Sequence, residues 1–294
     1  MFSHTSVLLE ETLKQLDPKP GSVVVDGTLG ACGHALSLLK RIEPEGLLIG
    51  FDKDPAAVRE AKQRLKNFGD RVMIFHDDFK NITSRLESLH MKTNSVLLDL
   101  GVSSPQLDQA ERGFSFNADG PLDMRMNPEE TLTAREVVNR YPQKTLADIF
   151  WNYGEERYSR RIAERIAEVR EKRRIDTTAE LESIIWQAVP SAARHGRIHP
   201  ATKVFQALRI EVNKEIEALE VFLSSVLESL ETNGRVVIIS FHSLEDRLVK
   251  TFFKEYARQK KGEILTKKPV VPQFEEIQKN PRSRSAKLRA FQKI

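Results

Sequence analysis

A single stretch, Ser22–His34, constrains the fold of this 294-residue chain more than any other. It begins with an apolar run of three valines that ends in Asp26, and glycines occupy three of the next seven positions. A helical pattern then runs from His34 to Leu39. A strand, a glycine-rich turn and a helix in this order predict the nucleotide-binding corner of a doubly wound α/β sheet. There the turn lets the backbone approach a ligand, and the start of the helix presents free N–H groups.

The acidic residue at the tip of this strand indicates which ligand the turn binds. The Asp26 carboxylate would repel a pyrophosphate, whereas it suits a ligand that carries an amino group. This chemistry predicts S-adenosylmethionine rather than a nicotinamide dinucleotide. The alternative to a methyltransferase is a nicotinamide-dependent oxidoreductase, which would share the first two strands. Such an enzyme would also need a hydride-transfer site, and this need distinguishes the two.

Three further apolar strands are predicted downstream, at 46–51, 71–75 and 95–98, and helical patterns at 55–65 and 82–89 separate them. Alternating β and α segments of this kind predict a parallel sheet, whose ligands lie at the carboxyl ends of the strands. Any one aspartate at such an end could simply cap a helix, but four in register favour a binding site. The four are Asp26, Asp52, Asp77 and Asp99.

Two of the residues near these ends suit an adenosine. Asp52 follows Gly30 by 22 residues, where a carboxylate can bind both ribose hydroxyls. Phe79, just after the third strand, provides an aromatic neighbour for the adenine.

The composition is that of a soluble enzyme in a reducing compartment. A hydrophobic content of 40% can fill a core, and the length predicts about two domains. No apolar run reaches the ~18 residues that a membrane span needs, and no secretory signal is visible. A single cysteine excludes an internal disulfide and any multi-cysteine zinc site. We therefore expect a cytoplasmic protein with no membrane partner.

Positive charge is concentrated in two segments. Residues 247–294 hold 14 Lys/Arg and 4 Asp/Glu, a net charge of +10 in a chain whose total is +4. Residues 157–174 hold 8 Lys/Arg against 3 Glu, and Ile162, Ile166 and Val169 form one helical face there. The arginines on the other face could bind a polyanion or could simply be solvated.

The alternation of strand and helix patterns stops after the fourth predicted strand. A loop-like stretch runs to residue 128, the patterns from 132 to 230 are helical, and a strand pattern returns at 234–239. We therefore predict a helical substrate-recognition domain, 106–206, inserted into an S-adenosylmethionine-binding domain made of 1–105 and 207–294. Beyond the fifth strand, Ser243–Asp246 is typical of a helix start, and Ile264 with residues 290–294 could close the sheet as a hairpin.

An ordered set of motifs now resembles a known family over nearly the whole chain. These motifs are His4–Glu11, Asp26–Gly30, Gly50–Asp54, Asp99–Gln106, Arg112–Phe116, Asp119–Met126, His199–Thr202, Phe205–Arg209, Ile239–Arg247 and Asn280–Lys287. The family that they resemble is the bacterial ribosomal RNA small subunit methyltransferase H family, also called MraW.

The resemblance implies both a fold and an activity. The fold is a Rossmann-like class I methyltransferase sheet with an inserted all-helical domain. The activity is transfer of a methyl group from S-adenosylmethionine to N4 of one cytidine in the decoding region of small-subunit (16S) ribosomal RNA. The implied partner is that RNA, naked or within an assembled or assembling subunit, and no oligomeric state is implied.

The resemblance also implies which residues bind the cofactor, namely Cys32, Gly33, His34, Asp52, Phe79, Asp99 and Gln106. One departure stands out, because the family's loop usually reads Gly-Gly-His and Cys32 replaces the first of these glycines. Contacts there can run through the backbone, so binding should survive. We expect the Cβ atom of Cys32 to rule out only a strongly positive φ.

The chemistry of the expected reaction points to the loop after the fourth strand. A sulfonium donor is already activated, so no metal is needed, but the acceptor amine must be held in line and must donate a hydrogen bond. We expect Asp99, Ser103 and Ser104 to form this catalytic neighbourhood. A simple turn before Pro105 is an equal alternative for each serine. A non-catalytic RNA-binding scaffold would have no use for the strand-end carboxylates.

Several other polar and aromatic residues allow two interpretations. Asp119, Asp123 and Arg125 could line the cytidine pocket or pin their own loop. His242 could accept a proton, although a histidine that starts a helix is the preferred interpretation. Trp151, Tyr153 and Tyr158 could stack on RNA bases, but we expect Trp151 and also Trp186 to lie in the core.

Overall fold

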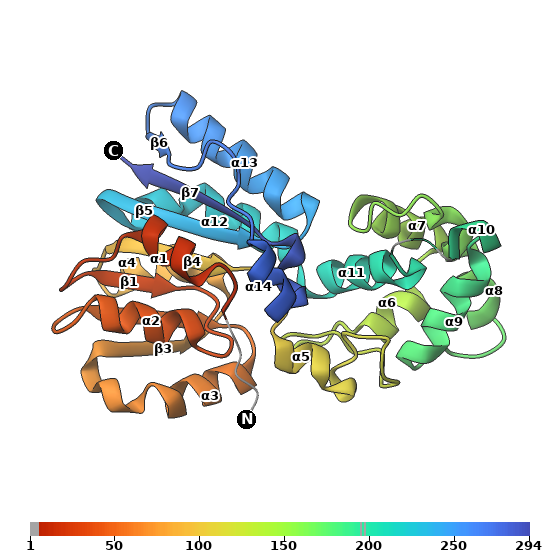
Figure 1. Ribbon diagram of the computed structural model, residues 1–294. Helices are drawn as coiled ribbons and strands as arrows, with labels where there is room; N and C mark the ends of the chain where they lie inside the picture. Colours follow the sequence, from red (N-terminus) through yellow and green to blue (C-terminus); the bar gives the residue numbers. More distant parts are fainter. Residues whose placement is uncertain (1–5, 195, 197) are drawn as a thin grey trace. The chain divides into compact units, whose positions relative to one another are not determined.

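The computed structural model describes residues 6–194, 196 and 198–294, so His4 and Thr5 of the first motif lie outside the described residues. The chain divides into two compact units. We call the residues up to Gly101 together with Ile216–Ile294 the sheet unit, and Val102–Glu215 the helical unit (Figure 1). Within the described ranges, no helix is both long enough and apolar enough to cross a membrane.

A seven-stranded sheet forms the centre of the sheet unit, in the order β3-β2-β1-β4-β5-β7-β6. Strands β1 to β5 are parallel, and β7 runs antiparallel to both β5 and β6. The strands are β1 (Val23–Asp26), β2 (Leu47–Asp52), β3 (Val72–His76), β4 (Thr93–Asp99), β5 (Leu230–Ser240), β6 (Gly262–Ile264) and β7 (Lys287–Lys293).

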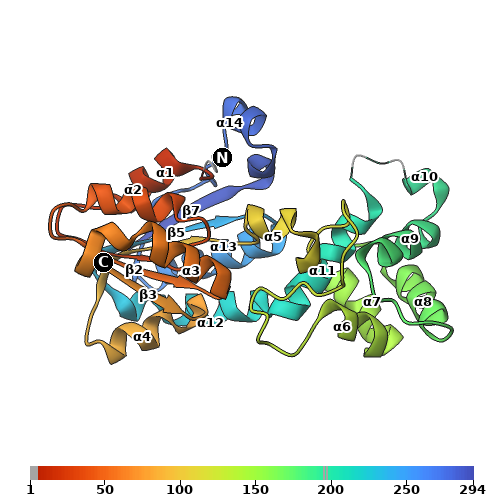
Figure 2. The same ribbon diagram turned by 90° about the horizontal axis from the view of Figure 1, so that it is seen from below.

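Helices cover both faces of this sheet because alternate strand residues point to opposite sides. Val24 belongs to one core with α1, α2 and α3, whereas Val25 belongs to a second core with α4, α12 and α13. Figure 2 shows α1 and α2 on the side of the sheet opposite to α4 and α12. The helices of the unit are α1 (Leu9–Leu16), α2 (Gly33–Arg41), α3 (Pro55–Arg64), α4 (Ile82–Ser88), α12 (Glu215–Ser229), α13 (Ser243–Arg258) and α14 (Phe274–Lys279), with short turns η1 (Lys66–Arg71), η2 (Phe79–Asn81) and η4 (Pro281–Ser285).

The predicted fold class is confirmed, since the parallel strands and the antiparallel β7 form a doubly wound Rossmann-like sheet of the class I methyltransferase kind. The closing hairpin is also present, because Ile264 of β6 pairs with Phe291 of β7. Strand β5 begins at Leu230, four residues earlier than the pattern at 234–239 predicted.

The helical unit has one core of its own, built from α6, α7, α8, α9 and α11. On α8 the predicted apolar face is confirmed, since Ile162 and Ile166 are buried in this core and Val169 packs against it. The elements of the unit are α5 (Ser104–Asp108), η3 (Ala110–Arg112), α6 (Ala134–Arg140), α7 (Gln143–Asn152), α8 (Ser159–Arg170), α9 (Thr178–Ala188), α10 (Ser191–Arg194) and α11 (Pro200–Asn213).

The units divide after Gly101 and after Glu215, rather than after residues 105 and 206 as we expected. The second boundary differs because α11 belongs to the helical core, to which it contributes Val204, Phe205 and Leu208. The last part of the helical pattern predicted for 132–230 is two helices, because Lys214 adopts a left-handed conformation with φ 53° and ends α11.

The prediction that Trp151 lies in the core is wrong, because its side chain is 59% exposed. Helix α7 buries Leu146, Ile149 and Phe150, and Trp151 falls outside that face. Trp186 is half-buried, and its ring stacks on that of His199 with centroids 5.3 Å apart.

Candidate active site

The predicted carboxylates meet at one edge of the sheet. Asp26, Asp52 and Asp99 are the last residues of β1, β2 and β4, and Asp77 directly follows β3. These four strands are parallel neighbours, so their carboxyl ends share an edge. The chain order reverses between β1 and β4, the position at which doubly wound sheets bind their ligands.

Asp52 holds the glycine-rich turn in place. Gly30 has a positive φ of 47°, and its N–H donates to Asp52 Oδ2 at 2.8 Å. The other oxygen, Oδ1, accepts a hydrogen bond of 2.8 Å from the Asp54 N–H. Burial nevertheless raises the pKa of Asp52 to about 6, against the opposing effect of these N–H donors. Each Asp52 oxygen keeps a second acceptor position for a ligand hydroxyl.

Asp26 and Asp99 differ from Asp52 because each has an oxygen without a partner. Asp26 Oδ1 accepts a hydrogen bond of 3.1 Å from the Thr28 N–H. Asp26 Oδ2 and Asp99 Oδ1 are buried and have no hydrogen-bond partner among the described residues. Burial raises the pKa of Asp26 to about 7. Burial, then the charges of Asp26 and Glu245, raise the pKa of Asp99 to about 8.

His34 lies beside Asp99 in the first turn of α2. Its side chain is buried, and Nε2 donates to the carbonyl oxygen of Val7 at 3.1 Å, because a carbonyl can only accept. The other ring nitrogen, Nδ1, lies 3.7 Å from Asp99 Oδ2. In the neutral ring Nδ1 therefore presents a lone pair to Asp99, an arrangement that favours the protonated carboxyl.

Cys32 contradicts our expectation about its backbone. It precedes α2 with φ 62°, in the left-handed region that favours glycine, although we expected its Cβ atom to exclude a strongly positive φ. The reason is that the left-handed region is open to ordinary residues at a cost of about 1–2 kcal/mol. The thiol is fully buried, and burial raises its pKa to about 12.

Gly33 and Phe79 are held close to the sheet edge by their neighbours. Gly33 is the first residue of α2, and a Cβ atom there would lie 2.0 Å from the side-chain oxygen of Ser6. Phe79 begins η2, and its ring makes an edge contact with that of Phe222 at 6.0 Å.

Asp77 is committed to its own loop and helix. Oδ1 accepts from the Asp78 N–H at 2.8 Å and from Asn81 Nδ2 at 2.7 Å, and Oδ2 accepts from Arg85 Nη2 at 3.0 Å. Burial by itself would raise the pKa of Asp77, but these hydrogen bonds outweigh it and lower the pKa. Of the four strand-end aspartates, Asp77 is thus the one with a plain structural role.

The remaining predicted site residues belong to the helical unit. Ser103 caps the start of α5, and its N–H donates to Gln106 Oε1 at 2.9 Å. Ser104 is the first residue of that helix, directly before Pro105. Gln106 is buried and completes this capping box, a contact that the resemblance did not imply.

The loop after α5 is pinned by its own polar residues. Asp119 Oδ1 accepts from the Ala179 N–H at 3.1 Å, at the start of α9. Arg125 binds both carboxylate oxygens of Asp123, at 2.8 and 2.6 Å. Of the two interpretations of these residues, the structure supports the pinning of the loop.

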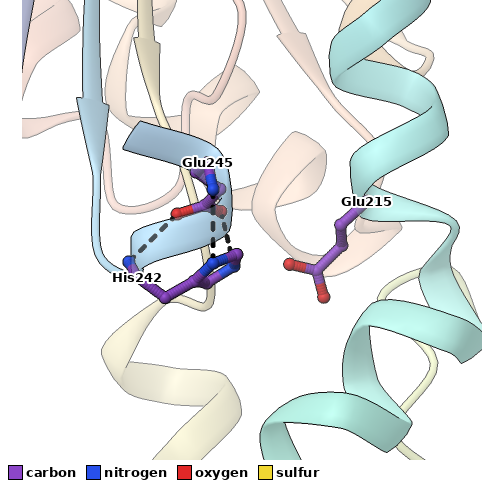
Figure 3. A group of neighbouring side chains, drawn as sticks. All are labelled: Glu215, His242 and Glu245. Atoms are coloured by element: carbon purple, nitrogen blue, oxygen red, sulfur yellow. Dashed lines mark hydrogen bonds and ion pairs between the residues drawn. The ribbon is translucent and has the colours of Figure 1, made fainter. Parts of the chain in front are cut away.

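His242 starts α13, as the preferred interpretation predicted (Figure 3). Its Nδ1 accepts from the Glu245 N–H at 3.4 Å, and Glu245 Oε2 accepts from the Phe241 N–H at 2.9 Å. Helix α13 begins at Ser243, as predicted, and His242 is the residue that caps it. Glu215, also drawn in Figure 3, binds Arg209 through both of its oxygens at 2.8 Å.

Sequence reasoning missed two residues at this edge. The Thr28 hydroxyl accepts a hydrogen bond of 2.7 Å from the Asp99 N–H and so ties the turn to β4. Glu245 is buried, and its charge helps to raise the pKa of Asp99. The motif around His242 showed a helix start, but nothing in it placed Glu245 near Asp99.

The carboxylates at this edge favour a cationic ligand over a dinucleotide. Two buried carboxylates with open oxygens, both with raised pKa values, suit a cationic group and oppose a pyrophosphate. Tyr256 and Lys260 have the Tyr-x-x-x-Lys spacing of some oxidoreductases, but the buried Tyr256 hydroxyl donates to the carbonyl oxygen of Leu223. Burial raises the pKa of that hydroxyl to about 12, which does not suit an acid in hydride transfer.

The family model described as "MraW methylase family" matches residues 1–294. The chain belongs to this family. Similar curated proteins, each named "Ribosomal RNA small subunit methyltransferase H", come from Heliobacterium modesticaldum (47% identical), Pelobacter propionicus (48%) and Clostridium botulinum (48%). Each match covers 100% of this chain and 99% of the relative. A solved SAM-dependent O-methyltransferase from Thermotoga maritima is similar at a TM-score of 0.42 and 11% identity, over 97% of this chain and 64% of that one.

The candidate active site is the carboxyl edge of β1–β4. The family motifs Asp26–Gly30 and Asp99–Gln106 contribute both aspartates with open oxygens.

Proposed function

We propose that this protein transfers a methyl group from S-adenosylmethionine to the N4 amine of a cytidine in the decoding region of small-subunit (16S) ribosomal RNA. The observation that carries the proposal is the pair of buried carboxylates, Asp26 and Asp99, each with an open oxygen, in a chain of the MraW methylase family. The printed name of the relatives supports small-subunit ribosomal RNA as the substrate.

The residues present fit the cofactor. S-adenosylmethionine supplies a methyl group on a positively charged sulfonium, and it also carries an ammonium group and a ribose. Asp26 and Asp99 would bind the cationic part, because their ionised forms gain most from a nearby positive charge. Asp52 would accept hydrogen bonds from the ribose hydroxyls through its free acceptor positions. Phe79 would contact the adenine, and the backbone of Cys32, Gly33 and His34 would line the methionine end, with Gln106 as the last of the expected contacts.

The acceptor amine needs a group that accepts its hydrogen bond and takes its proton. Asp99 would belong to the neighbourhood that supplies this group, because it ends β4 directly before the loop that contains Ser103 and Ser104. Ser103 and Ser104 follow Asp99 along the loop and would orient the amine through their hydroxyl or carbonyl oxygens. S-adenosylmethionine would supply the methyl group, and this acceptor would take the proton that the amine loses.

The helical unit would recognise the RNA. Arg157, Arg160 and Arg161 are exposed at the start of α8, and arginine suits phosphate. The predicted recognition domain, 106–206, contains this helix. A ribosomal RNA substrate and a free thiol at Cys32 both fit a cytoplasmic protein.

The test is methyl transfer in vitro. Purified protein is incubated with methyl-labelled S-adenosylmethionine and, in parallel, with naked small-subunit ribosomal RNA or with small subunits, and the RNA is digested to nucleosides for mass spectrometry. We expect one labelled nucleoside, a cytidine methylated on its exocyclic amine. A label on C5 of cytosine, on a ribose, or on protein alone would contradict the proposal. The substrate arm with the higher kcat/KM identifies naked RNA or the subunit as the substrate.

A further inference from the structure

A cavity of about 290 Å³ lies in the sheet unit between α13 and the β6–β7 hairpin. Its lining includes four cationic side chains, Lys250, Lys254, Lys267 and Arg289, and no acidic one. Phe253 and Ile264 add an apolar wall. We call it the α13–β6 cavity; it has no role in the proposed chemistry.

The cavity lies at another part of the sheet from the candidate active site. Strands β5 and β7 separate β6 from β4 in the strand order, and the carboxylates end β1, β2 and β4 (Figure 1). A group bound in this cavity is therefore not the methyl donor.

The three lysines of the cavity have no internal anion. Lys250 and Lys254 are four residues apart on α13, a spacing at which like charges repel on a helix surface. Lys267 comes from the segment after β6, and all three are exposed. In the part of the chain that the structure describes, none of the three pairs with a carboxylate. Their charge is thus available to an external ligand.

Arg289 contributes a fixed cation to the wall. Its side chain is buried, and Nε donates to Asp246 Oδ1 at 2.6 Å. Lys287 Nζ lies 3.4 Å from the other oxygen of that carboxylate, Oδ2. Asp246 is therefore neutralised by two cations, and hydrogen bonds and charge from Arg289 and Lys287 lower its pKa although burial opposes the shift.

We infer that the α13–β6 cavity binds one phosphate-bearing nucleotide of the RNA substrate, at a point remote from the target cytidine. The inference rests on the proposed function. Lysines at the rim would contact the phosphate, and Phe253 and Ile264 would contact the ribose or the edge of the base. The volume is at the lower end of the range for ligand cavities, which suits a single nucleotide. A concave site of this size favours RNA over a membrane, since proteins bind anionic lipids through broad basic faces.

The experiment compares two double variants with the same change of charge. Lys250→Ala with Lys267→Ala removes two exposed lysines of the cavity, and Lys40→Ala with Lys62→Ala removes two exposed lysines of α2 and α3 as the control. RNA affinity is measured at several salt concentrations. We expect the cavity variant to reduce the log–log salt slope by about 0.7–0.9, which corresponds to the loss of one phosphate contact. We also expect it to raise the KM for RNA about tenfold at unchanged kcat, while the control stays within about twofold of the wild type.

Direct binding separates this inference from the proposed function. Uridine 5′-monophosphate and uridine are each titrated into the wild type and both double variants. The wild type and the control variant should bind uridine 5′-monophosphate but not uridine. The cavity variant should bind neither. If the wild type methylates ribosomal RNA but the cavity variant matches the control in slope, KM and nucleotide binding, the inference is wrong and the function stands. If the nucleotide pattern holds but no RNA is methylated, the proposed function is wrong. Loss of binding to phosphatidylserine vesicles with unchanged RNA binding would assign the cavity to lipid instead.

Discussion

The sheet unit and the helical unit use their charged residues in opposite ways. In the sheet unit, Asp26 and Asp99 are buried, keep an oxygen without a partner and have raised pKa values. In the helical unit, Asp119 accepts a hydrogen bond from the start of α9, and Asp123 binds Arg125. Arginines at the start of α8 remain exposed.

This difference indicates what each unit has to bind. A buried, incompletely paired carboxylate costs folding free energy, and such a cost is typical of a site that awaits a cation. Exposed arginines cost little, and they attract a polyanion over a distance. For these residues the two units should therefore respond separately to mutation. The buried carboxylates of the sheet unit should control cofactor affinity, and the exposed arginines of α8 should contribute to salt-dependent RNA affinity.

The largest effect is expected for Asp52→Ala. This change removes the ribose acceptor and also the hydrogen bonds to Gly30 and Asp54, so S-adenosylmethionine should bind roughly ten- to a hundredfold more weakly, or about 1.5–3 kcal/mol. Calorimetric titration measures the affinity. Unchanged affinity for S-adenosylmethionine would refute the ribose assignment. A changed salt slope for RNA binding would show that the two units do not respond separately to mutation.

Asp26→Asn should weaken cofactor binding and yet stabilise the protein without ligand. The folded-state pKa, about 7, is above the ordinary value of 3.8, so ionisation at pH 8 disfavours the folded state and the neutral amide removes that cost. We expect about tenfold weaker binding, with a higher melting temperature at pH 8 and no gain near pH 4.

The matched control for that variant is Asp77→Asn. Asp77 has a lowered pKa and three hydrogen bonds, so its replacement should lower the melting temperature at neutral pH and leave cofactor affinity unchanged. Equal behaviour of the two variants would mean that Asp26 also has a purely structural role.

Cofactor binding should depend on pH through Asp26 and Asp99. Between about pH 4 and 8 the folded protein holds protons on these groups that the unfolded chain has lost, so stability without ligand falls as pH rises through this window. A cationic ligand favours the ionised carboxylates, so its binding should release protons, and affinity should rise by up to about tenfold per pH unit for each proton released. Calorimetry at pH 6.5 in buffers of different ionisation enthalpy measures the release. Proton uptake would contradict the assignment.

A smaller effect is expected in the helical unit, from Arg160→Ala with Arg161→Ala. If these exposed side chains bind RNA phosphates, the log–log salt slope should flatten by about 0.7–0.9 per lost contact, with cofactor affinity unchanged. The control is Arg140→Ala with Lys144→Ala, whose side chains already pair with Glu136 and Asp148. An equal slope for the two double variants would mean that α8 faces solvent or protein.

The smallest effect is expected for Cys32→Ser. Methylation at C5 of cytosine would require a cysteine nucleophile, but the Cys32 thiol is buried and its pKa is raised to about 12. The variant should keep most of its turnover, with at most a modest rise in the KM for S-adenosylmethionine. RNA that contains 5-fluorocytidine should form no covalent adduct. A trapped adduct, or complete loss of activity in a folded variant that binds cofactor, would overturn amine methylation.

Much of the fold followed from local patterns. The run Val23–Asp26 and its glycines predicted β1, the turn and α2, because apolar periodicity and backbone freedom act within a few residues. The helical pattern predicted up to residue 230 did not show the break between α11 and α12, because a left-handed Lys214 leaves no signal in the apolar pattern. Trp151 was misjudged because aromatic spacing does not show which face of a helix is covered.

The sequence by itself determined that four aspartates end neighbouring strands of a parallel sheet and that positive charge gathers in two segments. Only the tertiary structure distinguished the aspartates from one another. Asp77 is satisfied by Asn81 and Arg85, Asp52 by two backbone N–H groups, and Asp26 and Asp99 keep open oxygens. Burial and hydrogen-bond geometry set these differences, and both depend on residues distant in sequence, such as Glu245 beside Asp99.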